Sequence, residues 1–232
     1  MCYNDVIREG NIRMSYLILS IAMFVSSAIG FAFGFAKYIK PHKPLYASMI
    51  VLGVGCIMIG RAYILLRLVI GLEIAGIFHV GMLGTVGGFA FFFSANFGQI
   101  DSLVDGGEKI FRKYRIIPLL SIVVTAILYM FVFFGNAPLA EKITDGIVAL
   151  SIAAASYFHL KHLIIPDVDY GVVRCQRGYN LIALIYGILC MCEMTAAANM
   201  LEPVVIAACI LECVATLVLV PVMDMGVKKW SR

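Results

Sequence analysis

Seven predominantly apolar stretches, each about 20 residues or longer, take up most of this chain. About 20 consecutive apolar residues are needed for a helix to cross the hydrocarbon core of a bilayer. Only a helix of that kind satisfies its own backbone hydrogen bonds in lipid. We therefore predict an all-α, polytopic membrane protein with one domain, a seven-helix bundle over residues 1–232. The predicted spans are 14–36, 45–68, 72–97, 116–135, 143–164, 179–200 and 203–223.

The composition agrees with that prediction and excludes several classes of function. Of the 232 residues, 62% are hydrophobic and 14% are charged, whereas a soluble domain is about half apolar and a quarter charged. The connections are too short for a soluble kinase, nucleotide-binding or DNA-binding domain. The G-x-S-x-G nucleophile elbow, the Walker loop and the dinucleotide fingerprint are absent from the sequence. We expect the lipid bilayer as a partner, and no nucleic acid.

The distribution of Lys and Arg predicts the orientation. Of the 18 cations, 13 follow spans one, three, five and seven, and cytoplasmic loops carry such an excess. The N-terminus is therefore expected outside and the C-terminus in the cytoplasm. We expect a multi-pass protein of a cell membrane, and its compactness favours the bacterial inner membrane. The 13 cations are Lys37, Lys40, Lys43, Lys109, Arg112, Lys113, Arg115, Lys161, Arg174, Arg177, Lys228, Lys229 and Arg232.

Four ionisable residues are predicted to lie at one depth in the membrane. Arg61 and His79 are each about nine residues from the turn near residue 70, and Glu193 and Glu212 are about eight and eleven residues from the turn near 201. At about 1.5 Å per residue, all four lie roughly 12–16 Å below the outer boundary. That depth is near the middle of a core about 30 Å thick.

The charges of these four residues suggest a coupling site. Arg61 stays protonated and needs an anion, which one Glu can supply. The second Glu would be a surplus charge unless His79, a proton or a bound cation compensates it. We therefore predict a secondary transporter or ion-coupled carrier for a small polar solute or ion. The plainer alternative is an Arg61–Glu ion pair that only joins helices.

A second polar cluster is predicted at the cytoplasmic face. Asp101 and Asp105 follow the third span, and His159 and His162 end the fifth. Carboxylates and imidazoles at one face could hold a divalent metal, which would indicate an interfacial enzyme acting on a lipid. However, the spacing matches no metal signature such as H-E-x-x-H, and polar residues at helix ends often only meet water and headgroups. Whether the protein is an enzyme stays open, and the pattern names no metal or cofactor.

A small seven-helix receptor or sensor is the third interpretation. The predicted topology permits it, but the 98–115 loop and the short C-terminal tail offer little surface for a partner. The pattern fixes neither the solute nor the oligomeric state.

Small residues are expected to set the helix packing. The third predicted span carries glycines at 76, 81, 84, 87 and 88. Small residues at such spacing let helix backbones approach closely in membranes. We interpret these glycines as a packing face within the bundle.

Overall fold

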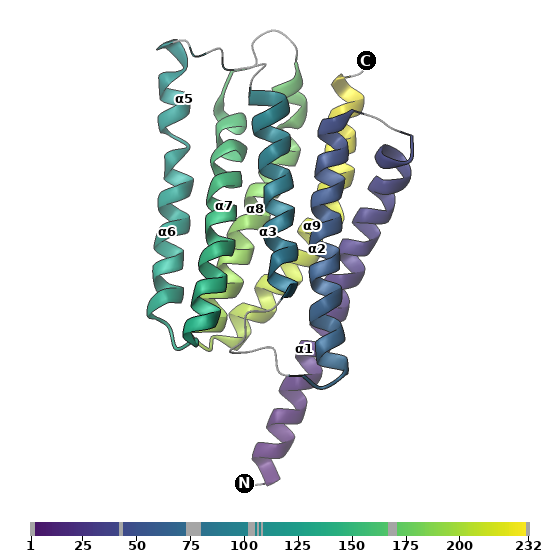
Figure 1. Ribbon diagram of the computed structural model, residues 1–232, viewed down its shortest axis with the longest axis vertical. Coiled ribbons are helices and arrows are strands. Elements are labelled where there is room, and N and C mark those ends of the chain that lie inside the picture. Colours follow the sequence, from purple (N-terminus) through teal and green to yellow (C-terminus); the bar gives the residue numbers. More distant parts are fainter. Residues whose placement is uncertain are drawn as a thin grey trace.

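The all-α prediction is confirmed in every part of the chain that the computed structural model describes, which is residues 3–41, 44–72, 80–101, 105, 107, 109–166 and 171–230. The helices lie side by side along the long axis of the molecule (Figure 1). Their bounds are α1 Tyr3–Gly34, η1 Phe35–Ile39, α2 Leu45–Val69, α3 Val80–Ala95, η2 Asn96–Asp101, η3 Lys109–Phe111, α5 Arg112–Ile116, α6 Leu119–Phe134, α7 Leu139–Ile164, α8 Val172–Ala198 and α9 Glu202–Trp230.

Within the described residues, six helical segments are long and apolar enough to cross a membrane, as expected of a multi-pass membrane protein. The predicted third span, 72–97, falls partly on residues 73–79, outside the described residues, and its described part is α3. The six segments are Met14–Ile39, Leu45–Val69, Lys109–Phe134, Leu139–Ile164, Val173–Ala198 and Glu202–Lys229.

Several helices extend beyond the apolar runs that predict them. The helical segment that corresponds to the predicted span 116–135 begins at Lys109 and continues through Pro118, which lies just before α6. Proline is compatible with a helix start because the first N–H groups have no intrahelical partner. Helix α9 runs through Pro221 to Trp230, past the predicted end at 223.

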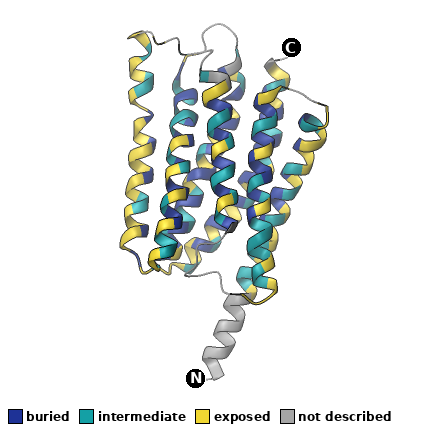
Figure 2. Cartoon of the chain, in the orientation of Figure 1, coloured by how far each residue is buried: buried dark blue, intermediate teal, exposed yellow. Residues whose placement is uncertain are grey.

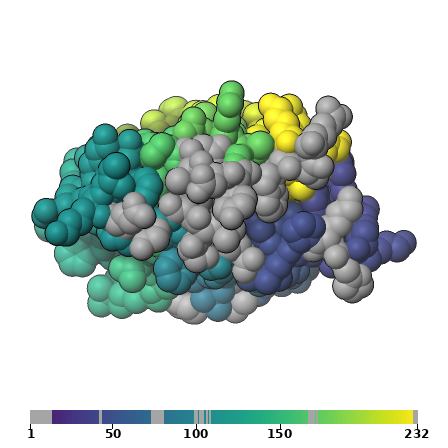
Figure 3. Space-filling model, turned by 90° about the horizontal axis from the view of Figure 1, so that it is seen from above, coloured from purple at the N-terminus to yellow at the C-terminus, as the bar shows by residue number. Residues whose placement is uncertain are grey.

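The two ends of the bundle differ in what they carry. Helix α1 begins at one end, and α9 finishes at the other (Figure 1). We call these the N-terminal end and the C-terminal end. The connection from α6 to α7 lies at the N-terminal end, whereas α2 and α8 begin, and α7 ends, at the C-terminal end (Figure 1). Seen from the C-terminal end, the molecule has an elongated outline with α5 and α6 far from α1 and α2 (Figure 3).

The interior lies between α2, α3, α7, α8 and α9. Helix α3 packs on α2 and α7, and α9 packs on α8, α1 and α2. Buried residues occupy the faces that the helices turn to one another, and exposed residues lie outward (Figure 2). Helix α6 is peripheral, with large apolar side chains such as Leu120, Ile127 and Phe131 exposed. An apolar outward face of this kind suits contact with lipid.

Candidate functional site

Arg61 of α2 contacts two carboxylates, one from α8 and one from α9. Its Nη2 lies 2.6 Å from Oε2 of Glu212 and 3.3 Å from Oε2 of Glu193. The side chain of Glu212 is 1% exposed, that of Arg61 12% and that of Glu193 25%. The structure thus brings three of the four predicted mid-membrane residues together. The fourth, His79, lies outside the described residues. We call the three the Arg61 cluster.

Neighbouring side chains hold the Arg61 cluster in a narrow crevice. Cys209 of α9 lies with its Sγ 3.6 Å from Oε1 of Glu193. The crevice beside Arg61 and Glu212 is lined by Tyr186 and Thr216, and in this conformation it has no room for a water molecule. The other oxygen of Glu212, Oε1, is buried without a hydrogen-bond partner among the described residues. The crevice is therefore too narrow for water, and the cluster is incompletely satisfied.

The charge of the Arg61 cluster is unbalanced when both carboxylates are ionised. One guanidinium then faces two carboxylates, which leaves one negative charge in a buried place. An uncompensated buried charge costs several kcal/mol, whereas a charge that is paired or neutralised by a proton avoids that cost. The arrangement can therefore bind one proton or one cation.

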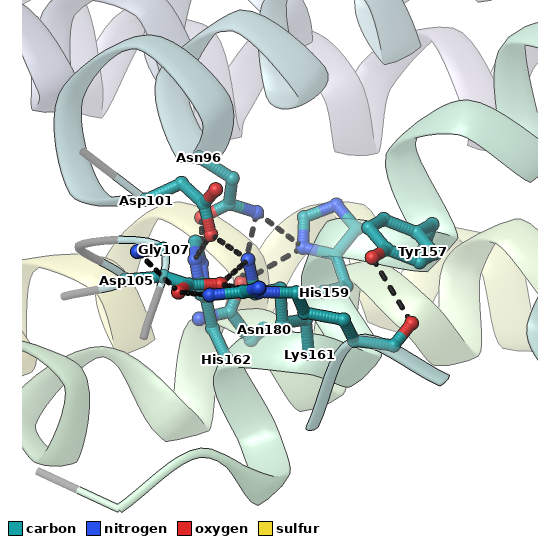
Figure 4. Close-up of polar contacts among 10 residues, drawn as sticks. Asn96, Asp101, Asp105, Gly107, Tyr157, His159, Lys161, His162 and Asn180 are labelled. Atoms are coloured by element: carbon teal, nitrogen blue, oxygen red, sulfur yellow. Dashed lines mark hydrogen bonds and ion pairs between the residues drawn. The ribbon is translucent and has the colours of Figure 1, made fainter. Parts of the chain in front are cut away.

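A second group of charges lies at the C-terminal end (Figure 4). The Nζ atom of Lys161 is 2.7 Å from Oδ1 of Asp101 and 2.7 Å from Oδ2 of Asp105. Arg115 donates to Asp105 from Nε at 2.7 Å and also from Nη2. The Nε2 atom of His162 lies 3.3 Å from Oδ1 of Asp101. Three of the four residues predicted at this face are thus connected, and we call this group the carboxylate cluster.

The two carboxylates of this cluster are held in their ionised form. The Arg115 hydrogen bonds, with help from Lys161 and the Gly107 N–H, lower the pKa of Asp105 well below its usual value. Burial by itself raises the pKa of Asp101, but hydrogen bonds from His162 and Lys161 outweigh it and lower that pKa.

The fourth predicted residue, His159, points away from the carboxylates and into the bundle. Its Nδ1 lies 2.8 Å from Nδ2 of Asn96 and 2.9 Å from Oδ1 of Asn180. Asn96 also donates to Asn180 at 3.0 Å, and its Oδ1 lies 3.2 Å from Nδ1 of His162. Asn96 therefore joins the carboxylate cluster to a deeper group of Asn96, His159 and Asn180, which we call the amide–imidazole cluster. All three of its residues are fully buried.

The metal-enzyme interpretation gains no support from these contacts. Within the described ranges, no group of three or more His, Cys, Asp or Glu side chains is arranged to hold a metal ion. The ammonium of Lys161 lies between the two carboxylates where that interpretation expects a metal.

Lys161, Asn96 and Asn180 belong to these clusters, although their place in the sequence did not predict it. Lys161 was counted among the cations that set topology, yet its side chain is 4% exposed. The available signal was Asn180 itself, which lies in an apolar span four residues after Gln176. Two amides at that spacing lie on one face of a helix.

Fold and contacts together define a multi-pass membrane protein with polar side chains clustered inside its bundle. No protein-family model, curated protein or solved structure matches this chain.

Proposed function

We propose that the protein is a secondary transporter or ion-coupled carrier for a small polar solute or ion, with its binding and coupling site at the Arg61 cluster. The observation that carries this proposal is that a single guanidinium contacts two carboxylates from two different helices, the buried Glu212 and the half-buried Glu193. Ionisable residues inside a membrane are expensive, and they commonly mark solute, ion or proton pathways.

The imbalance of charge provides a means of coupling. With one carboxylate neutralised by a proton or cation, Arg61 pairs with the other and the closed crevice is stable. When that proton or cation leaves, the surplus charge disfavours the closed conformation, because a buried unpaired charge costs several kcal/mol. The crevice then opens to water, where the surplus carboxylate can take a cation or a cationic group of the solute while Arg61 stays paired with the other carboxylate. His79 joins this group by its predicted depth.

The proposal includes seven spans with the N-terminus outside. Helix α1 begins and α9 ends at opposite ends of the bundle, which supports an odd number of crossings (Figure 1). Helix α3 lies among the other helices and would be the seventh. The carboxylate cluster and most of the counted cations would face the cytoplasm.

The test uses purified protein in proteoliposomes on a solid-supported membrane. Amino acids, mono- and dicarboxylates and sugars are applied in turn, and the transient current is recorded at several pH values. We expect a pH-dependent current with at least one of these solutes. Glu212→Gln and Glu193→Gln should reduce it to the level of empty liposomes, because either change removes the surplus carboxylate.

Glu202→Gln is the matched control, because Glu202 lies at the start of α9 and away from the Arg61 cluster. Its current should match that of the unaltered protein. Size-exclusion profiles and melting temperatures show whether each variant is folded. Normal currents from both folded cluster variants would leave the Arg–Glu contacts with only a structural role.

A further inference from the structure

Two phenylalanines of α3 lie between the Arg61 cluster and the amide–imidazole cluster. The ring of Phe89 stacks on Tyr186 with centroids 5.6 Å apart and planes 14° apart. Tyr186 in turn lines the crevice beside Arg61 and Glu212. A single ring, that of Tyr186, therefore separates Phe89 from the Arg61 cluster.

Phe92 makes the corresponding contacts on the other side. Its ring centroid lies 6.3 Å from that of His159 and 6.3 Å from that of Tyr179. Phe89 and Phe92 contact each other edge to face at 5.8 Å, and both are completely buried. The two rings thus form an apolar layer with polar side chains on both sides.

Buried polar atoms without partners lie on each side of this layer. Toward the C-terminal end they are Nε2 of His159, the hydroxyls of Tyr46 and Tyr179, and both amide atoms of Gln176. The rings of Tyr46 and Tyr179 are 6.0 Å apart, and those of Tyr179 and His159 are 5.5 Å apart. Each unsatisfied buried polar group costs about 1–3 kcal/mol. Several such groups on rings that adjoin one another indicate a place that can hold water or a transferred proton.

The unpartnered atoms on the other side are the Tyr186 hydroxyl and Oε1 of Glu212. Tyr179, Tyr186 and Glu193 are seven residues apart along α8, so all three lie on one face of that helix. Helix α8 therefore presents a polar stripe that runs from the amide–imidazole cluster to the Arg61 cluster, and Ala183 interrupts it midway.

We propose that the coupling ion is a proton that passes between the C-terminal end and the Arg61 cluster through His159, Tyr179 and Tyr186, with Phe89 and Phe92 as the gate. This proposal rests on the proposed function and names its coupling ion and route. Water molecules complete the path when the rings separate, and close ring contact excludes them, as in hydrophobic constrictions that gate by dewetting.

His159 is suited to relay the proton on the side of the gate that faces the C-terminal end. An imidazole can accept a proton at Nε2 and later release it from the same atom. The neutral amides of Asn96 and Asn180, which do not accept a proton, hold Nδ1, and Nε2 has no hydrogen-bond partner among the described residues, so the proton is exchanged at Nε2 through water. The titratable groups nearest to it are Tyr179 of α8 and, on its own helix, His162. From the η2 side the contact is the neutral amide of Asn96. Asp101 and Lys161 lie one contact further out, beyond His162.

The gate fits closely against α2 at one glycine. A Cβ atom at Gly53 would lie 2.6 Å from Cε1 of Phe92 and 3.0 Å from the carbonyl oxygen of Gly88. The Phe92 ring therefore packs directly on the α2 backbone. A smaller side chain at 92 would leave a gap between α2 and α8 beside His159 and Tyr179.

Proton flux without solute tests the gate. Proteoliposomes with a trapped pH-sensitive dye are given a potassium diffusion potential, and the rate of internal pH change is measured. The unaltered protein should be nearly impermeable to protons. Phe92→Ala should raise the flux severalfold, and Phe92→Met, which keeps most of the volume but not the rigid ring, should raise it less. Leu219→Ala removes a buried side chain from α9 and should not raise the flux.

Second substitutions in the Phe92→Ala protein test the route. His159→Gln or Tyr186→Phe should return the flux toward that of the unaltered protein. Tyr129→Phe is the control, because that hydroxyl donates to the Lys142 carbonyl away from the route. Folded Phe92→Ala and Phe92→Met proteins that stay tight would overturn the gate. If the proton flux of the Phe92→Ala protein is unchanged by His159→Gln and by Tyr186→Phe, the route is overturned. Solute-evoked currents that still require Glu212 would, in either case, leave the transport proposal standing.

Discussion

Carboxylates in this protein have two very different surroundings. Glu212 is buried in the middle of the bundle and shares one guanidinium with Glu193. Asp105 lies at the C-terminal end and receives two cations, Arg115 and Lys161, for its single charge. The first arrangement lacks positive charge and can gain a proton. The second has ample positive charge and stays ionised. The proposed coupling therefore lies at the Arg61 cluster, whereas the carboxylate cluster joins helix ends through its ion pairs.

The stability of the C-terminal end should depend on pH through the protonation of Asp105. Its pKa is lowered in the folded protein, so the stabilisation is fully present above the unfolded value of about 3.9 and is lost as pH falls toward the folded value. Asp105→Asn should cost about 1.5–3 kcal/mol near neutral pH, the usual contribution of hydrogen bonds to a charged group. Melting temperatures from about pH 6 to about pH 3 should fall less in Asp105→Asn than in the unaltered protein. Equal falls would contradict this assignment.

The depth of a residue in the membrane could be predicted from the sequence, but the direction in which its side chain points around the helix axis could not. Counting residues from the turns placed Arg61, Glu193 and Glu212 at one height, and the side chains do meet. The same counting cannot tell an exposed cation from a buried one. Lys161 near a helix end therefore looked like a topology signal, although it is buried between Asp101 and Asp105.

At the scale of the helices, glycines fix the contact between α2 and α3. A Cβ atom at Gly84 would lie 2.5 Å from the carbonyl oxygen of Cys56 and 2.6 Å from the Cα of Gly60. Backbones this close leave no space for a side chain. The interpretation of glycines in the third span as a packing face agrees with the contacts of Gly81, Gly84 and Gly88, whereas Gly76 lies outside the described residues. Because α3 carries Phe89 and Phe92, this contact also positions the proposed gate.

Gly84→Ala should therefore destabilise the bundle. The added methyl group meets backbone atoms that cannot rotate away, and such overpacking typically costs about 1–3 kcal/mol. Gly98→Ala is the matched control, because a Cβ atom there would have no neighbour within 4 Å. Melting of the two purified proteins in the same detergent is the measurement. A melting temperature for Gly84→Ala equal to that of Gly98→Ala would show that α2 and α3 separate without cost.

The ends of the helices were less predictable than their existence. Hydropathy marks the part of a helix in contact with lipid, but a helix can continue through polar residues beyond it. The segment from Lys109 and the last turns of α9 are of that kind. Pro221 did not end α9, because neighbouring helices and local adjustments can satisfy the freed backbone groups within a membrane bundle.

At the scale of the whole molecule, the helical class followed from the apolar runs, but the order of the helices around the bundle did not. Lipid and protein interior are both apolar, so a membrane helix carries little sign of which face meets a neighbour. The contact of α1 with α9 and that of α3 with α7 join distant parts of the chain. Those contacts bring α2, α8 and α9 together around Arg61.

The number of crossings depends on α3, since the other six segments are long and apolar enough to span. Reporter fusions in a bacterial inner membrane can test it, with green fluorescent protein as the cytoplasmic reporter and alkaline phosphatase, which needs disulfides, as the external one. Fusions that end at Gly71, before α3, should give phosphatase activity without fluorescence. Fusions that end at Arg115, after α3 and its cations, should fluoresce, because the Lys and Arg excess at 109–115 holds that connection inside. The same pattern at both positions would mean that α3 does not cross. The bundle would then have six spans, and the gate residues Phe89 and Phe92 would lie on a helix that does not traverse the membrane.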